Sequence, residues 1–305
     1  MTTPGRTRPA LSAPGLDRAA EERSADGLIE RLRADAATRV LVLHGDAAPL
    51  AATDRPALHF AAPGDVPASA EWAFLGRDAD GVAVLSATFG ADASAPFSAP
   101  GRWAGLRAVG GDLSRDEAGL FVEALSLGRW LLEAPFCPAC GARTELRGAG
   151  WSRHCPDCGR EHFPRTDPAV IVAVTSAQDP DLLLLGSNAA WGADRYSCFA
   201  GFAEAGESLE AAVVREVREE SGVEVASLQY RGSQAWPYPR SLMLGFFATA
   251  LEDAAARPDL DEIAAVRWFT RDEIGAGLAG EGDVLLPGPA SIAHRLISDW
   301  HAGAE

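Results

Sequence analysis

Two Cys-x-x-Cys motifs constrain the fold of this 305-residue chain more than any other feature. Cys137 and Cys140 form the first pair and Cys155 and Cys158 the second, with 14 residues between the pairs. Four thiolates at this spacing are typical of a tetrahedral zinc site in a reducing compartment, where disulfides are rare. The sequence therefore predicts a zinc ribbon with one structural zinc ion, because four cysteine ligands leave no open position for a substrate.

Charge and hydropathy limit what else the chain can bind. The formal net charge is −16, so we expect the chain to be a poor general binder of nucleic acids or membrane surfaces, because like charges repel. The apolar runs are far shorter than the ~18 residues of a membrane span, and no apolar segment follows Arg6 and Arg8 as it would in a signal peptide. We expect a cytoplasmic protein with no membrane partner. Cys198, the fifth cysteine, is expected to be a small buried residue.

Turn signals and periodicity predict an α/β chain of three domains. Residues 1–133 form an N-terminal α/β domain that begins with a disordered arm at 1–27, residues 134–166 form the ribbon, and residues 167–305 form the C-terminal domain. Strands are expected at 39–43, 72–75, 82–85, 169–174 and 182–185, and a surface loop at 275–282. A capping box, Ser114 to Glu117, opens a helix that runs to about Glu133.

Four arginines make the ribbon locally basic in an acidic chain, namely Arg143, Arg147, Arg153 and Arg160. Two interpretations remain open: the arginines form an ordinary solvated surface, or they form a patch that faces RNA.

Residues 209–221 predict an amphipathic helix, which ends before Gly222. Its apolar stripe consists of Leu209, Ala212, Val213 and Val217. Glu216 and Glu220 fall inside this stripe, and Glu219 lies at its border. Unpaired carboxylates cost several kcal/mol to bury, so a cation must offset them, and hard oxygen clusters bind Mg²⁺ or Mn²⁺. Arg215 and Glu207 are placed to brace the cluster by ion pairing.

Residues 201–223 resemble the Nudix box, G-x5-E-x7-R-E-U-x-E-E-x-G-U with U apolar, at every fixed position. Gly201, Glu207 and Gly222 are fixed positions of that motif. The resemblance implies a Nudix α/β/α sandwich with a mixed sheet in the C-terminal domain. It also implies hydrolysis of a nucleoside diphosphate linked to another group.

A second resemblance narrows the branch. Residues 233–243, SQAWPYPRSLM, resemble the SQPWPFPxS array of NADH pyrophosphatases of the NudC type. Ala235 stands where that array has proline, and Tyr238 where it has phenylalanine. The order of an N-terminal domain, a four-cysteine ribbon and a Nudix domain also resembles this branch, as does the segment from Leu285 to Ile297.

The resemblance also implies site residues. Two or three Mg²⁺ or Mn²⁺ ions would be ligated by the Ala200 carbonyl and by Glu216, Glu219, Glu220 and Glu262. Glu219 would help to activate water, and Arg215 completes the catalytic set. The implied substrate-binding residues are Phe163, Gln234, Ala235, Trp236, Pro237, Tyr238, Pro239, Arg240, Ser241 and Ala293. Arg107 is the one N-terminal side chain that we nominate for a phosphate.

The function implied by this branch is hydrolysis of NAD(H) to NMN(H) and AMP, with removal of NAD caps from RNA 5′ ends. The branch is typically homodimeric. A Nudix hydrolase that prefers ADP-ribose is one alternative, and a zinc-ribbon RNA-binding regulator with an inactive Nudix fold is another. A dinucleotide-binding oxidoreductase is disfavoured, because no G-x-G-x-x-G follows an expected strand.

Overall fold

A computed structural model of the chain describes residues 16–192 and 194–303, so most of the predicted arm at 1–27 lies outside the described residues. Contacts divide the chain into two units. The N-terminal unit runs to Thr166 and includes Pro237–Arg240, and the C-terminal unit comprises Asp167–Trp236 and the chain from Ser241 onward. Each unit is described by itself.

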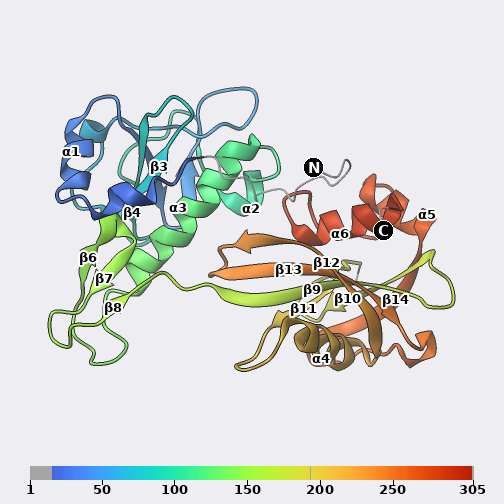
Figure 1. Ribbon diagram of the computed structural model, residues 1–305. Coiled ribbons are helices and arrows are strands. Elements are labelled where there is room, and N and C mark those ends of the chain that lie inside the picture. Colours follow the sequence, from blue (N-terminus) through green and yellow to red (C-terminus); the bar gives the residue numbers. More distant parts are fainter. Residues whose placement is uncertain (1–15, 193, 304–305) are drawn as a thin grey trace. The chain divides into compact units, whose positions relative to one another are not determined.

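The N-terminal unit contains a five-stranded sheet in the order β3-β4-β1-β2-β5. The strands are β1 (Arg39–His44), β2 (Ala47–Pro49), β3 (Glu71–Arg77), β4 (Ala83–Phe89) and β5 (Trp103–Gly105). The helices are α1 (Leu28–Ala34), α2 (Leu106–Val109) and α3 (Arg115–Glu133), with 3-10 turns η1 (Ala20–Ser24) and η2 (Pro63–Asp65). The sequence predicted β1, β3, β4 and α3 at these places, and α3 contacts β1, β3 and β4 (Figure 1).

The predicted start of α3 is confirmed at Ser114, whose side chain accepts a hydrogen bond from the Glu117 N–H. The reciprocal half of the capping box does not form as expected. The Glu117 carboxylate instead accepts hydrogen bonds from the Leu58 N–H, at 2.8 Å, and from the Ser114 hydroxyl, at 2.6 Å. Glu117 thus ties α3 to the segment that follows β2.

The prediction of a disordered arm is wrong for residues 16–27. The backbone of Asp17 pairs with Arg77 of β3, and the Glu22 carboxylate forms a two-bond ion pair with the same arginine. Arg23 lies over the Trp151 ring at 3.8 Å. Sequence composition predicted disorder here because it could not register these partners, which are all distant in the chain.

The ribbon consists of β6 (Glu145–Arg147), β7 (Ser152–His154) and β8 (Glu161–His162), with the turn η3 (Gly148–Gly150). It packs on the rest of the N-terminal unit through Trp151, whose Nε1–H donates to the Phe74 carbonyl at 2.7 Å. A Cβ at Gly150, where φ is +93°, would meet the Ala73 side chain and backbone within 3.0 Å. Glycine is therefore required at this contact.

The C-terminal unit contains a mixed sheet in the order β12-β13-β9-β10-β14, with β11 paired to β9. Its strands are β9 (Asp167–Thr175), β10 (Leu182–Asn188), β11 (Phe199–Phe202), β12 (Val225–Trp236), β13 (Ser241–Ala250) and β14 (Ile263–Thr270). Its helices are α4 (Leu209–Ser221), α5 (Arg271–Leu278) and α6 (Ile292–His301), with η4 at Asp253–Ala255. The predicted α/β/α sandwich is confirmed.

Helices cover both faces of this sheet, α4 on one and α5 with α6 on the other (Figure 1). Strand β9 contains the predicted strand at 169–174, and its position in the sheet explains why this segment is apolar at every residue. Val170, Val172 and Val174 pack in the cluster that includes α4, and Ile171 and Ala173 pack in the cluster that includes α6. A strand buried on both faces has no polar alternation.

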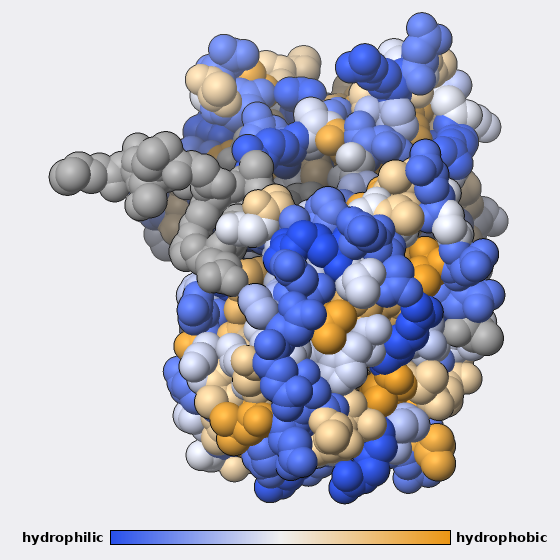
Figure 2. Space-filling model, turned by 90° about the vertical axis from the view of Figure 1, so that its right-hand side faces the viewer, coloured by the Kyte–Doolittle hydropathy of each residue, from blue (hydrophilic) through white to orange (hydrophobic). Residues whose placement is uncertain are grey.

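Exposed apolar side chains are dispersed among hydrophilic ones on the face of the molecule that Figure 2 shows. Within the described residues, no helix combines the length and apolarity that crossing a bilayer requires. Cys198 is 7% exposed, as predicted for a small buried residue.

Candidate metal centres and the adjoining cavity

The four ribbon cysteines converge as the sequence predicts. Their Sγ atoms all lie within 4.8 Å of one another, with Cys137 and Cys158 3.7 Å apart and Cys140 and Cys155 3.5 Å apart. A tetrahedron with Zn–S bonds of about 2.3 Å has edges of about 3.8 Å, so the sulfurs fit zinc. His162 Nε2 lies 3.2 Å from the Cys137 sulfur and can donate a hydrogen bond to that thiolate.

The ribbon arginines do not form a single patch. Arg153 is 4% exposed, and its guanidinium donates to the Leu131 carbonyl at 2.6 Å. It therefore holds the ribbon against α3, and the RNA-facing interpretation is wrong for this residue. Arg143, Arg147 and Arg160 are exposed.

Helix α4 is fixed at both ends by the residues that the sequence predicts. The Ser208 side chain caps the start by accepting from the Ala211 N–H, and Gly222 ends the helix at φ +70°. Along the helix, Glu220 is buried at 7% exposure, the Glu216 side chain is 14% exposed and the Glu219 side chain is 54% exposed. The periodicity argument is thus confirmed for all three carboxylates.

Gly201 of β11 lies against the Glu216 side chain. An ideal Cβ built on Gly201 would overlap the Glu216 carboxylate. A glycine at this position is what lets the half-buried carboxylate occupy the space beside β11.

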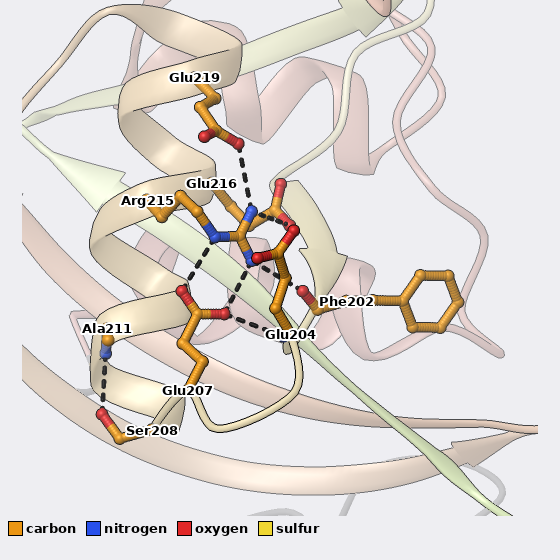
Figure 3. A network of polar contacts seen from close by, with 8 residues as sticks. All are labelled: Phe202, Glu204, Glu207, Ser208, Ala211, Arg215, Glu216 and Glu219. Carbon is orange, nitrogen blue, oxygen red and sulfur yellow. Dashed lines mark hydrogen bonds and ion pairs between the residues drawn. The ribbon is translucent and has the colours of Figure 1, made fainter.

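Arg215 is the centre of an ion-pair network beside α4 (Figure 3). Its guanidinium donates to both oxygens of Glu207 at 2.9 Å, to Glu216 at 2.8 Å and to Glu219 at 3.1 Å. It also donates to the Phe202 carbonyl at 2.9 Å. This hydrogen bonding lowers the pKa of Glu207 to about 2, so Glu207 stays ionised and holds Arg215 in place.

Burial raises the pKa of Glu220 to about 8, although the Ala200 N–H donates to this carboxylate at 3.2 Å. The negative charges of Glu216, Glu262 and Asp259 contribute to the same rise. Burial also raises the pKa of Glu216, against the opposing hydrogen bond from Arg215. Carboxylates that resist ionisation in this way would be stabilised as anions by a bound cation.

Glu262 is presented by a turn before β14. The Asp259 carboxylate accepts from the N–H groups of Asp261, Glu262 and Ile263, and so fixes the turn. Within the described ranges, only the ribbon cysteines bring three or more ligand atoms within 4.8 Å of one another, so these carboxylates are less tightly gathered.

A cavity of about 300 Å³ adjoins the carboxylates within the C-terminal unit. Glu220 and Ala200 contribute to its wall, together with Gln234, Trp236 and Ala293, which the sequence nominated for the substrate. Its size falls at the lower end of the range for small-molecule sites. The cavity therefore joins the nominated metal ligands to part of the nominated substrate loop.

Three family models match the chain. They are described as a NUDIX domain (residues 165–286), an NADH pyrophosphatase zinc ribbon domain (133–163) and an NADH pyrophosphatase-like rudimentary NUDIX domain (37–130). A Mycobacterium tuberculosis protein named NAD-capped RNA hydrolase NudC is 38% identical over 97% of this chain and 96% of its own length. The chain belongs to the NudC family of Nudix hydrolases.

Two further proteins with the same name cover less of the chain. That of Stutzerimonas stutzeri is 40% identical over 66% of this chain and 69% of its own length, and that of Pseudomonas aeruginosa 42% over 66% and 68%.

The nominated substrate loop of this NudC-family chain is divided by the fold. Gln234, Ala235 and Trp236 belong to β12, where Ala235 pairs in register with Leu242 of β13. The Gln234 amide donates to the Ala290 carbonyl at 2.8 Å and accepts from the Ile292 N–H at 2.7 Å. Gln234 thus fixes the start of α6, which carries Ala293, in addition to lining the cavity.

Residues Pro237–Arg240 group with the N-terminal unit. There the Arg107 N–H donates to the Tyr238 hydroxyl at 3.3 Å, and the Arg107 guanidinium lies over the Tyr238 ring at 3.9 Å. One face of the ring that the sequence nominated for stacking is therefore covered by the arginine that it nominated for a phosphate. Ser241 is buried, and Pro239 and Arg240 are exposed.

The structure adds site residues that the sequence analysis did not select. Trp191 and Arg195 line the cavity from the loop between β10 and β11. The Phe202 carbonyl accepts from Arg215, whereas its ring points away from the carboxylates (Figure 3) and the residue is 53% exposed. Phe163, which the sequence did nominate, is 49% exposed. The available signal in the sequence for Phe202 was its position directly after Gly201, a fixed position of the motif.

Proposed function

We propose that this protein hydrolyses the pyrophosphate bond of NAD(H) to give NMN(H) and AMP, and removes NAD caps from RNA, releasing NMN and leaving a 5′-monophosphate. The observation that carries the proposal is the buried Glu220 carboxylate, which lines the cavity and interacts electrostatically with Glu216 and Glu262. The names of its relatives, which cover nearly the whole chain at 38% identity, supply the substrate class.

The donor set fits Mg²⁺ or Mn²⁺. Glu216, Glu220 and Glu262, with the Ala200 carbonyl, offer hard oxygen ligands. Burial raises the pKa of Glu216 and of Glu220, so a bound cation would stabilise the ionised forms of these two carboxylates. When bound, such ions neutralise the pyrophosphate charge and lower the pKa of an attacking water.

The chain's own residues position the carboxylates and accept a proton from the attacking water. Arg215, held by Glu207, fixes the carboxylates of Glu216 and Glu219 from one side. Glu219 is more exposed than Glu207, Glu216 and Glu220, the other glutamates at fixed positions of the motif, and is our choice for accepting a proton from water. Trp236 lines the cavity and offers an aromatic surface for a base or the nicotinamide.

We also propose a cytoplasmic homodimer, and we retain the division into domains at 1–133, 134–166 and 167–305. The family resemblance supports the dimer, and the soluble-type composition supports the compartment.

Product analysis with matched variants tests the proposal. NADH, ADP-ribose and NAD-capped RNA are incubated with Mg²⁺ or Mn²⁺, and NMN(H) and AMP are quantified. We expect turnover of NADH and capped RNA, and a loss of about 100-fold or more in Glu220→Gln, because ion binding supplies several kcal/mol of transition-state stabilisation. Glu210→Gln, on the exposed side of the same helix, should retain activity.

A preference for ADP-ribose would establish the alternative Nudix substrate. The absence of hydrolysis of every substrate would support an inactive regulator. Full activity in folded Glu220→Gln would contradict the metal assignment.

A further inference from the structure

Arg195 is the one basic residue among those described as lining the cavity beside Glu220. It lies in the loop between β10 and β11, as does Trp191, which is 38% exposed. The rest of this wall is apolar or neutral apart from Glu220. A cation on the wall of a cavity in an otherwise acidic chain indicates an anionic ligand.

The guanidinium of Arg195 is not engaged by an acidic partner. Across residues 16–192 and 194–303, no carboxylate comes within 4.0 Å of it, and its side chain lies over the Trp191 ring at 4.9 Å. Other arginines of this unit differ: Arg215 is paired with Glu207, and Arg271 with Asp181. Arg195 therefore keeps its hydrogen-bond donors available.

The backbone on either side of Arg195 is fixed. The Tyr196 N–H donates to the Leu285 carbonyl at 3.1 Å, and the Leu285 N–H donates to the Asp194 carbonyl at 2.8 Å. Ser197 and Gly186 exchange two further backbone hydrogen bonds, at 2.9 and 3.0 Å. The loop thus holds the base of the side chain at the cavity while leaving its charged end uncommitted.

Guanidinium chemistry specifies the ligand class. The planar donors of arginine match two oxygens of a phosphate group. Stacking on an indole ring already restricts the orientation of the side chain, so less conformational entropy is lost when the ligand binds. Trp191 can hold Arg195 in this way. The adjoining carboxylates would repel the same phosphate without such a counter-charge.

We propose that Arg195, oriented by Trp191, binds a phosphate group of the substrate in this cavity and thereby sets substrate affinity. The inference rests on the proposed pyrophosphate hydrolysis. The phosphate has two possible sources, the pyrophosphate bridge of the free dinucleotide and the phosphodiester that continues into a capped RNA.

Steady-state kinetics of Arg195→Gln and Arg195→Lys on NADH and on a short NAD-capped RNA test this proposal. We expect Arg195→Gln to raise KM by about 10-fold for at least one substrate, with kcat within about 2-fold of the wild type, because a charged two-bond contact is lost. The KM of Arg195→Lys should lie between those of the wild type and Arg195→Gln, since lysine keeps the charge but lacks the planar pair of donors. A rise for both substrates assigns the contact to the dinucleotide, and a rise for capped RNA alone assigns it to the RNA.

Arg218→Gln is the matched control, because Arg218 is exposed on α4 and does not line the cavity. Unchanged KM for both substrates in Arg195→Gln, a change equal to that of Arg218→Gln, or a fall in kcat alone would overturn the proposal. Affinity for NADH and for the capped RNA is measured in parallel by tryptophan fluorescence. If the wild type hydrolyses neither substrate, the proposed function fails, and the affinities of the variants still decide the role of Arg195.

Discussion

At the scale of single residues, the carboxylates of α4 follow directly from helical periodicity, but their neighbours do not. Glu216 and Glu220 could be placed among apolar residues because the spacing of four fixes them on one face. Glu262 was reached only through family resemblance, since a turn residue has no periodic signal. Arg195 was missed because an arginine in a short loop looks like any solvated charge, and its position at the cavity emerges only from the pairing of residues near 195 with Leu285.

Gly201 provides the first residue-scale prediction. In Gly201→Ala the new Cβ meets the Glu216 carboxylate, which must move. We expect NADH hydrolysis to fall by about 100-fold, the effect of a catalytic group displaced by about 1 Å. The comparison is Gly90→Ala, where a Cβ meets nothing within 4 Å. Equal activity of the two variants in a hydrolysis assay would show that the contact has no role.

At the scale of elements, long and strongly patterned segments were predictable and short glycine-rich ones were not. Helix α4 and strand β9 lie where the sequence predicted them. The apolar stripe of α4 continues over several turns, and the apolar run of β9 continues over several residues. The expected loop at 275–282 is wrong in its first part, because α5 continues to Leu278. Gly275 and Gly277 occur in this helix because of close packing: a Cβ would lie 2.7 Å from His301 Nε2 at the first and 3.0 Å from Leu286 at the second. Such packing partners are invisible to local propensity.

Helix α3 carries a buried carboxylate that makes the N-terminal unit sensitive to pH. Burial raises the pKa of Glu123 to about 7, although Arg18 lies 3.6 Å away. The folded state then retains a proton that the unfolded chain releases near pH 4.5. The contribution of Glu123 to stability is therefore greatest below pH 4.5, and about 3 kcal/mol of it is lost as the pH rises from there through 7.

Thermal unfolding of Glu123→Gln between pH 5 and pH 8 checks this prediction. The variant should lose much of the decline that the wild type shows, since its amide does not titrate. Glu133→Gln, exposed near the end of the same helix, should behave as the wild type. Identical pH profiles for all three proteins would refute the assignment.

At the scale of the whole molecule, the order of the domains was predictable from motifs, whereas the grouping of segments was not. The ribbon groups with the N-terminal unit through the hydrogen bonds of Trp151 to Phe74 and of Arg153 to Leu131. Neither residue carries a sequence signal for such a partner, because each bond joins segments that are distant along the chain. The grouping of Pro237–Arg240 with the N-terminal unit was likewise not predictable, because Tyr238 contacts Arg107, which is distant along the chain.

Zinc removal should therefore affect the two units differently. After chelation, or in Cys140→Ser, we expect faster hydrogen exchange in the ribbon and in the parts of β3 and α3 that it contacts, because the ribbon depends on its ion for folding. Protection of β9 and β13 in the C-terminal unit should change little. Cys198→Ser serves as the control cysteine outside the ribbon. Uniform loss of protection across both units would contradict this division.

The central claim is that the buried carboxylates of α4 bind the divalent ions that cleave the substrate, and Mn²⁺ binding measured together with activity tests it most directly. Mn²⁺ bound to the wild type, to Glu216→Gln/Glu220→Gln and to Glu210→Gln is counted by electron paramagnetic resonance, and the same samples are assayed for NMNH release from NADH. The account predicts that the double variant loses both bound Mn²⁺ and hydrolysis, while Glu210→Gln keeps both. Undiminished hydrolysis, or unchanged Mn²⁺ binding, in a folded double variant would contradict it.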